Sequence, residues 1–281
     1  MATSRKQTSR SRRAELEAKK LAQQQRDRKI RLLTFGAAGV VIVAIIIVLV
    51  VALNQAKEGG DIVPLHGDAA QTGITPNPDV AADVPTLDIY SDFQCPNCGT
   101  LETAVGDAVQ SLIDDGSAKV VFHTRTFLDS SLESYNADAG NPKSSRRAAI
   151  AAACADTVEG DYYFPFFREI YNNQPTTEGD GYSHTLLRDT IPATVGLTGD
   201  ALTSFQTCYD DEATGKFVTA VDGWAQNTAK VNSTPTYKLN GTDITSDIFP
   251  NITDSTDEDA VATANAAAAA KLLELVGDAT V

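Results

Sequence analysis

The sequence predicts an α/β domain in which a block of helices interrupts a central β-sheet, with a single membrane-spanning helix ahead of it. Three observations lead to this prediction. Strand patterns occur near both ends of the domain and helix patterns lie between them. A long run of uncharged residues precedes the domain. A Cys-Pro-Asn-Cys motif, from Cys95 to Cys98, directly follows the first predicted strand.

The first 53 residues divide sharply by charge. Residues 1–31 hold eleven Lys or Arg and three acidic residues, whereas residues 32–53 hold no charged residue and are mostly Val, Ile, Leu and Ala. A helix of that length extends about 33 Å, which is enough to cross the apolar core of a bilayer. We therefore expect a basic cytoplasmic tail over 1–31, a transmembrane helix over 32–53 and an extracytoplasmic remainder, following the positive-inside rule.

A cleaved signal peptide is the main alternative for this segment. It fits less well, because the apolar run and the basic region before it are both long for a signal peptide. The residues from Val51 to Ala56 also lack a clear small-residue cleavage site. We expect the anchor to be retained. Membrane topology then explains the basic tail without any binding of nucleic acid.

The formal net charge of −14 combines a tail of +8 with a remainder of −22, which disfavours anionic partners. The chain has four cysteines, all on the predicted exported side, where disulfides persist. Four cysteines in 281 residues are too few for a small domain that depends on disulfides for its stability. The domain is long enough to bury a core of its own.

Residues 54–85 are rich in Gly and Pro with little apolar periodicity, so we expect a linker between membrane and domain there. The domain itself is expected over 86–281. A strand is predicted from Thr86 to Gln94, a helix from 99 to 109, and a second strand, rich in β-branched residues, over 118–125.

A helical block follows the second strand. A loop is expected over 129–141, followed by helices over 145–155, 162–172, 185–191, 200–208 and 212–227. The sheet pattern then returns with a strand over 236–239, a tight turn at Asn240-Gly241 and a partner strand over 242–245. An Ala-rich helix with an acidic start closes the chain over 255–276.

The Cys-Pro-Asn-Cys motif lies where the first strand meets the first helix. Cys95 is therefore expected at the helix N-terminus, where free N–H groups and the helix dipole stabilise a thiolate. Thiolates attack disulfides, so this position indicates thiol–disulfide exchange, with Cys95 attacking and the more buried Cys98 resolving. Pro96 favours a helix start. Asn97 offers only a neutral amide, which predicts a weaker oxidant than a histidine at this position would give.

Other chemistries fit the motif poorly. Zinc would need two further ligands at suitable spacing, but the remaining cysteines are 54 residues apart and the three histidines are scattered. A purely structural disulfide is disfavoured because so small a ring constrains the unfolded chain little. We therefore expect no metal and no cofactor. His123, on the second predicted strand, is expected to be a satisfied structural residue.

A second motif, from Ser233 to Thr236, directly precedes the third predicted strand. Its proline, Pro235, fits either a trans residue at a strand edge or a cis residue in a loop beside an active site. These residues alone leave both alternatives open.

Together the two motifs resemble the DsbA-like branch of the thioredoxin superfamily, in particular its membrane-anchored actinobacterial forms. The resemblance rests on the run from Ser91 to Cys98, on Thr234-Pro235-Thr236 with Asn240-Gly241 downstream, and on the helical block with its own cysteines. It covers roughly residues 80–280. It implies a thioredoxin fold with an α-helical insertion at about 128–230.

The resemblance also implies roles for single residues. Thr234 and Pro235 would form a cis-proline dipeptide packed against the cysteine pair, and the Thr234 backbone would pair with an extended substrate. Many relatives carry a buried acidic residue six positions before the first cysteine, where this chain has Ile89. The proton acceptor for the resolving thiol therefore stays open between water, Asp88 and Asp92. A satisfied turn residue is the favoured interpretation of Asp92.

Cys154 and Cys208 are expected to form a structural disulfide. Two cysteines on separate helices in an oxidising compartment most simply pair, and the relatives make the same pairing. Closing a loop of this length stabilises a fold by roughly 4 kcal/mol in the chain-entropy model. A second, electron-relaying pair is the alternative.

These observations predict a membrane-tethered thiol–disulfide oxidoreductase that forms disulfides in exported proteins with free cysteines. The resemblance suggests a quinone-linked membrane oxidase as the reoxidising partner. A reductase or isomerase of the same fold, for example one acting on apocytochrome thiols, is one alternative. A non-catalytic envelope module that binds a soft metal is the other. We expect a monomer, because no dimerisation segment is evident.

Overall fold

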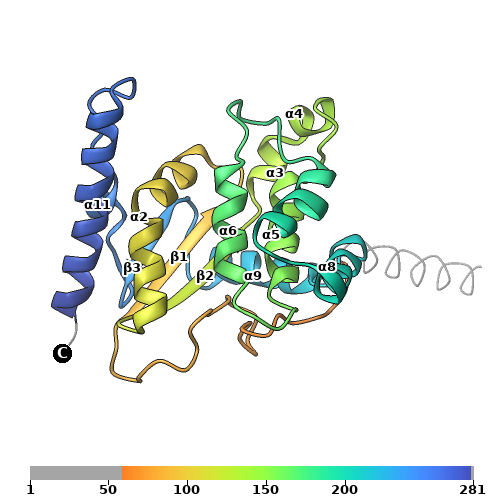
Figure 1. Cartoon of the computed structure of the whole chain (residues 1–281), viewed down its shortest axis with the longest axis horizontal. Coiled ribbons are helices and arrows are strands. Elements are labelled where there is room, and N and C mark those ends of the chain that lie inside the picture. The colour runs from red at the N-terminus through yellow and green to blue at the C-terminus, as the bar shows by residue number, and fades with distance from the viewer. Residues whose placement is uncertain (1–58, 280–281) are drawn as a thin grey trace, which may run out of the picture. The chain divides into compact units, whose positions relative to one another are not determined.

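A computed structural model describes residues 59–279, so the predicted basic tail (1–31) and transmembrane helix (32–53) lie outside the described residues. The described residues contain a four-stranded sheet in the order β2-β1-β3-β4 (Figure 1). Its strands are β1 (Thr86–Asp92), β2 (Lys119–Arg125), β3 (Thr236–Leu239) and β4 (Thr242–Asp243). β1 is parallel to β2 and antiparallel to β3, and β3 is antiparallel to β4.

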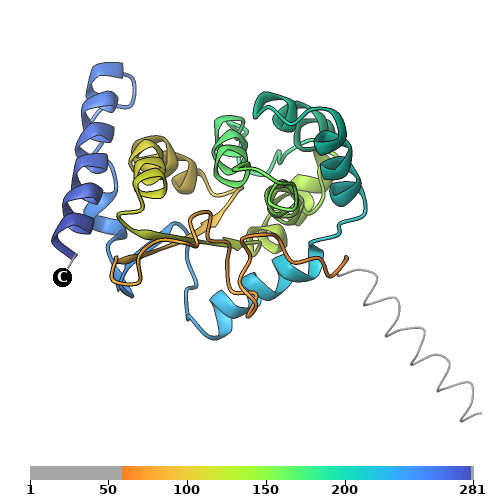
Figure 2. The ribbon, with the colours of Figure 1, turned by 60° about the horizontal axis from the view of Figure 1, so that its bottom comes forward.

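Alternation along β1 separates the two faces of the sheet. Leu87 and Ile89 point into the main core together with Phe122 of β2, and all three are almost completely buried. Tyr90 and His123 lie on the opposite face, in a second cluster with residues of α9 (Gly215–Asn227). Figure 2 shows α9 on the side of the sheet opposite to α2.

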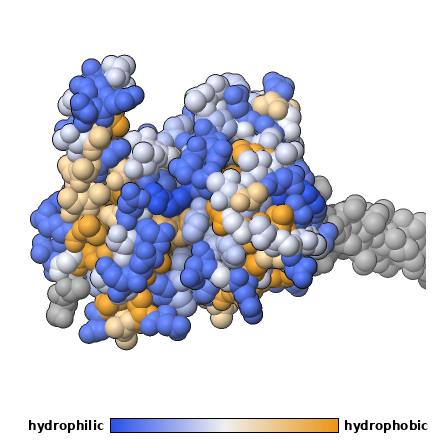
Figure 3. All heavy atoms as spheres, viewed as in Figure 1, coloured by the Kyte–Doolittle hydropathy of each residue, from blue (hydrophilic) through white to orange (hydrophobic). Residues whose placement is uncertain are grey.

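The main face of the sheet is covered by α2 (Pro96–Asp115) and α6 (Tyr163–Asn172). α2 buries Leu101, Val105 and Val109 at four-residue spacing, which is the apolar stripe of an amphipathic helix. The C-terminal helix α11 (Glu258–Ala279) packs against α2 with a narrower stripe, Ala268, Leu272 and Val276. Figure 3 shows a pale apolar strip along α11 next to its hydrophilic end.

The helical insertion lies between β2 and β3. Besides α6 and α9 it comprises α3 (Leu128–Ser131), α4 (Glu133–Asp138), α5 (Ser144–Ala155), the π-helical turn η1 (Leu186–Thr190), α7 (Ile191–Thr194) and α8 (Gly199–Asp210). α5 is the most buried of these helices, because its alanines let the neighbouring helices approach closely. A last short helix, α10 (Thr245–Ile248), follows β4. The predicted α/β sheet with a helical insertion is confirmed.

Local predictions failed at two places in the domain. The loop expected over 129–141 contains α3 and α4, held by tertiary contacts: Asn136 of α4 donates to Gln94 Oε1 and to the Gly179 carbonyl, at 2.7 Å each. The fourth strand ends at Asp243, because the Asp243 carboxylate accepts hydrogen bonds from the Thr245 N–H and hydroxyl and starts α10 instead.

The segment before β1 differs most from its prediction as a linker (54–85). Its described part lies along the domain: the Gly60 N–H donates to the Glu212 carbonyl at 2.9 Å, and the Gly60 carbonyl accepts from the Lys216 N–H at 2.9 Å. Ile74 forms an antiparallel bridge with Phe122 and so covers the outer edge of β2. The glycines that suggested flexibility instead permit close approach, since a Cβ on Gly60 would lie 2.6 Å from the Ala213 carbonyl oxygen.

A disulfide joins Cys154 of α5 to Cys208 of α8, with an S–S distance of 2.00 Å and a Cα–Cα distance of 5.8 Å. It connects two helices of the insertion and lies apart from Cys95 and Cys98, which are both free thiols.

Candidate active site

The site begins where β1 passes into α2. Cys95 is the N-cap residue of α2, with extended backbone angles (φ −76°, ψ 117°), and Pro96 is the first helical residue. The helix therefore starts three residues before the predicted boundary at Gly99. The missing N–H of Pro96 costs nothing here, because the first-turn N–H groups of a helix have no partner within it. The Cys95 carbonyl instead accepts from the Cys98 and Gly99 N–H groups.

The two cysteines are both buried, but their pKa values shift in opposite directions. Cys95 is 8% exposed and Cys98 only 2%. The Cys95 pKa is lowered to about 6, chiefly because the Cys98 thiol donates to its sulfur, with help from the Thr234 side chain and the Cys98 and Asn97 N–H groups; burial opposes this shift. The Cys98 pKa is raised well above its usual range, first by burial and then by its hydrogen bond to Cys95. These opposite shifts favour Cys95 as the residue that carries the thiolate of the reduced pair.

Thr234 and Pro235 lie beside Cys95, and the peptide bond between them is cis. The Cys95 sulfur lies 3.4 Å from the Thr234 carbonyl oxygen, to which it donates when it is protonated. The Thr234 hydroxyl is buried and has no other partner among the described residues, which leaves it available to a Cys95 thiolate. The preceding chain is fixed by Arg125 at the end of β2, which donates to the Val231 carbonyl and to Asp222 of α9.

A surface hollow of about 390 Å³ opens in front of Cys95. Pro96 and Asn97, both exposed, line this hollow together with the segment from Asn232 to Thr234. Phe127 and Leu128, at the start of the insertion, add apolar surface. The structure thus brings together all the residues predicted for the redox site: Cys95, Pro96, Asn97, Cys98, Thr234 and Pro235.

Side chains of the insertion hold the turn between β1 and α2 by donating hydrogen bonds to the backbone carbonyls of that turn. The Tyr171 hydroxyl donates to the Asp92 carbonyl (3.1 Å) and the Tyr182 hydroxyl to the Phe93 carbonyl (2.6 Å). Gln174 Nε2 donates to the carbonyls of Phe93 (2.8 Å) and Cys95 (3.0 Å). Sequence reasoning missed all three donors. They lie about eighty residues from their acceptors, and no local pattern marks such contacts.

Asp92 is the satisfied turn residue that the sequence favoured. One carboxylate oxygen accepts from the Ser145 hydroxyl (2.6 Å) and the Gln94 N–H (3.1 Å), and the other accepts from the Leu128 N–H (3.2 Å). Complete burial nevertheless raises its pKa to about 7, and these hydrogen bonds only partly oppose the shift. This carboxylate joins the active-site turn to the start of the insertion.

The other acidic candidate, Asp88, lies on the face of β1 that carries Tyr90, opposite to Leu87 and Ile89. Its carboxylate is 3.0 Å from His123 Nε2, and His123 Nδ1 lies 2.6 Å from the Thr72 carbonyl. The His123 ring is stacked between Tyr90 and Trp224. As predicted, His123 is a structural residue, because both of its ring nitrogens have hydrogen-bond partners. Asp88 is one of these two partners.

A buried acid that the sequence reasoning missed lies on α2. Glu102 is 4% exposed, and burial raises its pKa to about 8 against the opposing effect of Arg168 of α6. A signal was present in the sequence: Glu102 follows Cys98 by four residues, so both lie on the same side of the helix as the apolar stripe.

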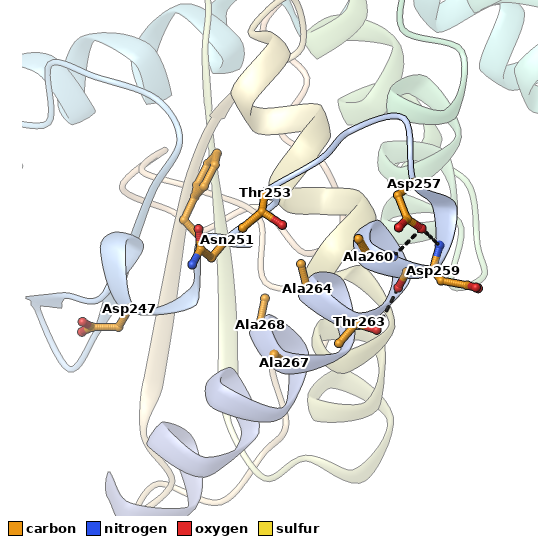
Figure 4. Close-up of a pocket in the computed structure, with 11 residues that line it drawn as sticks. Asp247, Asn251, Thr253, Asp257, Asp259, Ala260, Thr263, Ala264, Ala267 and Ala268 are labelled. Atoms are coloured by element: carbon orange, nitrogen blue, oxygen red, sulfur yellow. Dashed lines mark hydrogen bonds between the residues drawn. The ribbon is translucent and has the colours of Figure 1, made fainter.

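A second hollow, of about 580 Å³, lies between α11 and the segment after α10 (Figure 4). Three aspartates surround it and alanines of α11 form its floor. Asp257 is already used as the cap of α11, since it accepts from the N–H groups of Asp259 and Ala260. The lining includes neither redox cysteine. Between residues 59 and 279, no three His, Cys, Asp or Glu side chains are grouped to hold a metal ion.

Comparison with known proteins gives a consistent result. The sequence profile of a family described as thioredoxin matches residues 80–260. Disulfide bond formation protein D of Bacillus subtilis (strain 168) is 24% identical over 152 residues, which is 53% of this chain. The matched part spans 60% of the length of that relative.

Solved structures share the fold. MdbA, a thiol-disulfide oxidoreductase from Actinomyces oris, superposes with a TM-score of 0.58 at 18% identity, over 80% of this chain and 94% of MdbA. MdbA from Corynebacterium diphtheriae superposes with a TM-score of 0.50 at 21% identity, over 67% of this chain and 92% of that protein.

Proposed function

The chain belongs to the thioredoxin family, and we propose that it is a DsbA-like thiol–disulfide oxidoreductase whose redox pair is Cys95–Cys98. The observation that carries the proposal is the opposed pair of sulfurs next to the cis Thr234–Pro235 bond. A stabilised thiolate at a helix N-terminus, with a buried thiol one turn later, is an arrangement suited to disulfide exchange.

The forward reaction is formation of a disulfide in a substrate. A substrate thiolate attacks Cys95 Sγ, the Cys95–Cys98 bond breaks, and its electron pair leaves on Cys98. A second substrate thiolate then attacks the substrate sulfur of the mixed disulfide. Cys98 takes up one of the two protons that the substrate thiols release, and the products are a substrate disulfide and a reduced pair with the thiolate on Cys95.

The lowered Cys95 pKa favours this direction. A thiolate pKa of about 6 instead of 9 stabilises the reduced pair at pH 7 by roughly 1.4 kcal/mol, which corresponds to about 30 mV for a two-electron couple. Stabilising the reduced form makes the disulfide a better oxidant. The shift alone is modest, in keeping with the neutral amide at Asn97.

The hollow at Cys95 suits an unfolded chain. Asn232, Ser233 and Thr234 line the hollow, and the Thr234 carbonyl contacts the Cys95 sulfur, so that an extended peptide can add to this segment by main-chain hydrogen bonds. Phe127 and Leu128 provide apolar contact beside it. We propose exported proteins with free cysteines as substrates, recognised mainly through their backbone.

The remaining parts of the proposal rest on the sequence. The protein is anchored in the cell membrane by one helix over 32–53, with its N-terminus in the cytoplasm and the catalytic domain outside. A membrane partner, a quinone-linked oxidase, reoxidises the cysteine pair. The protein acts as a monomer.

An oxidative refolding assay tests the proposal. The purified full-length chain, with its Cys95–Cys98 pair oxidised, is mixed with a reduced, unfolded secretory protein, and substrate thiols are counted over time. The wild type is expected to remove two thiols per chain. Cys95→Ser should remove none, and Cys98→Ser, loaded as a mixed disulfide at Cys95, should transfer that single disulfide. Thiol loss at equal rates with the wild type and Cys95→Ser would contradict the proposal.

A further inference from the structure

Among the described residues, Glu178 is the one acidic or basic side chain that lines the hollow in front of Cys95. It lies in the loop after α6 and is exposed. Within residues 59–279 its carboxylate has no hydrogen-bond donor and no ion-pair partner. A negative charge without a protein partner, next to the reactive sulfur, is available to a substrate.

The turn that carries Glu178 is fixed by backbone contacts. The Asp180 N–H donates to the Thr177 carbonyl at 3.2 Å, so Glu178 lies inside a four-residue turn. The Gly179 carbonyl accepts from the side-chain amide of the buried Asn136 at 2.7 Å. Gly179 itself has a φ of +96°, and an added Cβ would collide with a neighbouring side chain. The fold therefore determines the point from which the Glu178 side chain reaches the hollow.

The same loop also contacts the turn that carries Cys95. Gln174, four residues before Glu178, donates to the Cys95 carbonyl at 3.0 Å. Tyr182, four residues after it, donates through its hydroxyl to the Phe93 carbonyl at 2.6 Å. Glu178 therefore lies between two residues that attach the loop to the active-site turn, and its position relative to Cys95 is held on both sides.

An apolar surface accompanies the carboxylate. Phe127 and Leu128 line the same hollow, and both are half-buried. The Arg125 guanidinium lies 5.1 Å from the centre of the Phe127 ring, but its charge is already paired with Asp222. Lys and Arg side chains have a long apolar stem that ends in a charge. An acid beside an apolar surface therefore suits a basic side chain.

The charge of the substrate matters in the first step of exchange. The attacking group is a thiolate, so an anion must approach Cys95 in the presence of Glu178. Repulsion from the carboxylate opposes this approach unless the substrate brings a cation with it. A basic residue beside the substrate cysteine cancels the repulsion. It also lowers the pKa of the substrate thiol and so increases the thiolate fraction.

We propose that Glu178, Phe127 and Leu128 form a subsite for a Lys or Arg side chain that flanks the reactive cysteine of the substrate. This inference rests on the proposed redox role of Cys95. The stem of the basic side chain packs on Phe127 and Leu128, and its charged end pairs with the Glu178 carboxylate. The favoured substrates are polypeptides whose cysteines have basic neighbours. Anionic thiols are disfavoured by the same carboxylate.

Other acids near the redox site are less suited to this role. Asp92 is buried, and its carboxylate already accepts three hydrogen bonds. Asp243 lines a neighbouring hollow, but its carboxylate is engaged by the N–H and the hydroxyl of Thr245. Asp180 is exposed but does not line the hollow at Cys95. Glu178 is therefore the acid that a substrate side chain meets beside the sulfur.

Three model peptides test the subsite. They share one short sequence with two cysteines and differ only in the two residues that flank the first cysteine, which are both Lys, both Gln or both Glu. The oxidised full-length chain is mixed with each peptide at low salt, and the second-order rate constant for loss of peptide thiols is measured. The preference of a chain is its rate with the Lys peptide divided by its rate with the Glu peptide. Comparing this preference between two chains cancels the intrinsic reactivity of the peptides.

The wild type should prefer the Lys peptide, with the Gln peptide between the other two. Glu178→Gln should lower the preference about two- to fivefold, the range that one exposed ion pair provides, and Glu178→Lys should lower it further. Salt at about 1 M should weaken the wild-type preference, because the Debye length is then about 3 Å. Asp180→Asn is the matched control. It removes an exposed acid from the same turn but outside the hollow, and it should keep the wild-type preference.

Equal preferences in the wild type, Glu178→Gln and Glu178→Lys would overturn the inference. An equal loss of preference in Asp180→Asn would overturn it too, because the effect would then come from net charge and not from a subsite. Failure of the proposed function looks different: the wild type would oxidise all three peptides no faster than Cys95→Ser does.

Discussion

Cys95 and Cys98 are separated by two residues, yet their surroundings drive their pKa values in opposite directions. Burial disfavours both thiolates. Only Cys95 receives enough donors to reverse this effect: the Cys98 thiol, the Thr234 side chain and the first N–H groups of α2. The asymmetry follows from the place of each sulfur on the helix, since Cys95 caps α2 and Cys98 lies inside its first turn.

Titration of the thiolate absorbance in the reduced chain should therefore show a midpoint near pH 6. Cys98→Ala should raise that midpoint by about one unit or more, because it removes the largest source of stabilisation. Cys154 and Cys208 do not titrate, because they are joined. A wild-type midpoint near pH 8.5, the value of an ordinary thiol, would show that α2 does not activate Cys95.

Residues that carry the chemistry were predictable when a short motif marked them. The pair Cys95 and Cys98 was found from its spacing and its position after a strand. The isomer at Pro235 could not be decided from its neighbours, and only the family resemblance favoured the cis form now seen. Gln174 was not found at all, since it contacts the Cys95 carbonyl across 79 residues.

At the level of elements, the segment over 59–85 shows why glycine content misled the prediction. Gly59 and Gly60 lie against the turn between α8 and α9, where backbone approaches backbone too closely for any side chain. Gly59 also adopts a positive φ of 77°, which other residues rarely do. Flexible linkers and close contacts both select glycine, and the difference lies in a tertiary contact that the sequence does not display.

Gly60→Ala should consequently destabilise the domain. Its Cβ would lie 2.6 Å from the Ala213 carbonyl oxygen, and relief requires backbone movement that costs roughly 1–3 kcal/mol. Gly223→Ala is the matched control, because it lies in α9 with no heavy atom within 4 Å of the added Cβ. The control should be neutral or stabilising by up to about 1 kcal/mol. Equal urea midpoints for the wild type and Gly60→Ala would support the linker prediction after all.

The insertion carries its own covalent constraint, the disulfide between α5 and α8. Replacing both Cys154 and Cys208 by Ala should lower the free energy of unfolding by up to about 4 kcal/mol. This is the free energy that corresponds to the entropy of closing a loop of this length in the unfolded chain. Urea denaturation measures this loss. The redox potential of Cys95–Cys98 should stay the same in the double variant. A changed potential would favour the alternative that the second pair relays electrons.

Across the whole domain, the order of the strands and the longer helices was predictable because each of these has a strong local pattern. β1 and β2 show β-branched alternation, α5 is alanine-rich, and Asn240-Gly241 forms the turn between β3 and β4. What the sequence did not reveal is how the insertion reaches back to the sheet. Tyr171, Tyr182 and Gln174 fix the carbonyls of the active-site turn from one side, and Arg125 fixes the Thr234 loop from the other.

Those contacts make the insertion part of the active site and not only a cover for it. The carbonyls that they hold belong to Asp92, Phe93 and Cys95, the residues that set where α2 begins. Only after the chain has folded do donors from α6 and the loops around it meet that turn. The position of the Cys95 sulfur is therefore a property of the whole molecule.

The reduction potential of Cys95–Cys98 tests the central claim most directly. The full-length chain is equilibrated with glutathione buffers, its thiols are trapped, and the oxidised fraction is counted. A disulfide donor should have a potential well above the roughly −270 mV of thioredoxin, towards the roughly −120 mV of strong oxidants. A value near or below about −270 mV would contradict the oxidase assignment and indicate a protein that reduces disulfides.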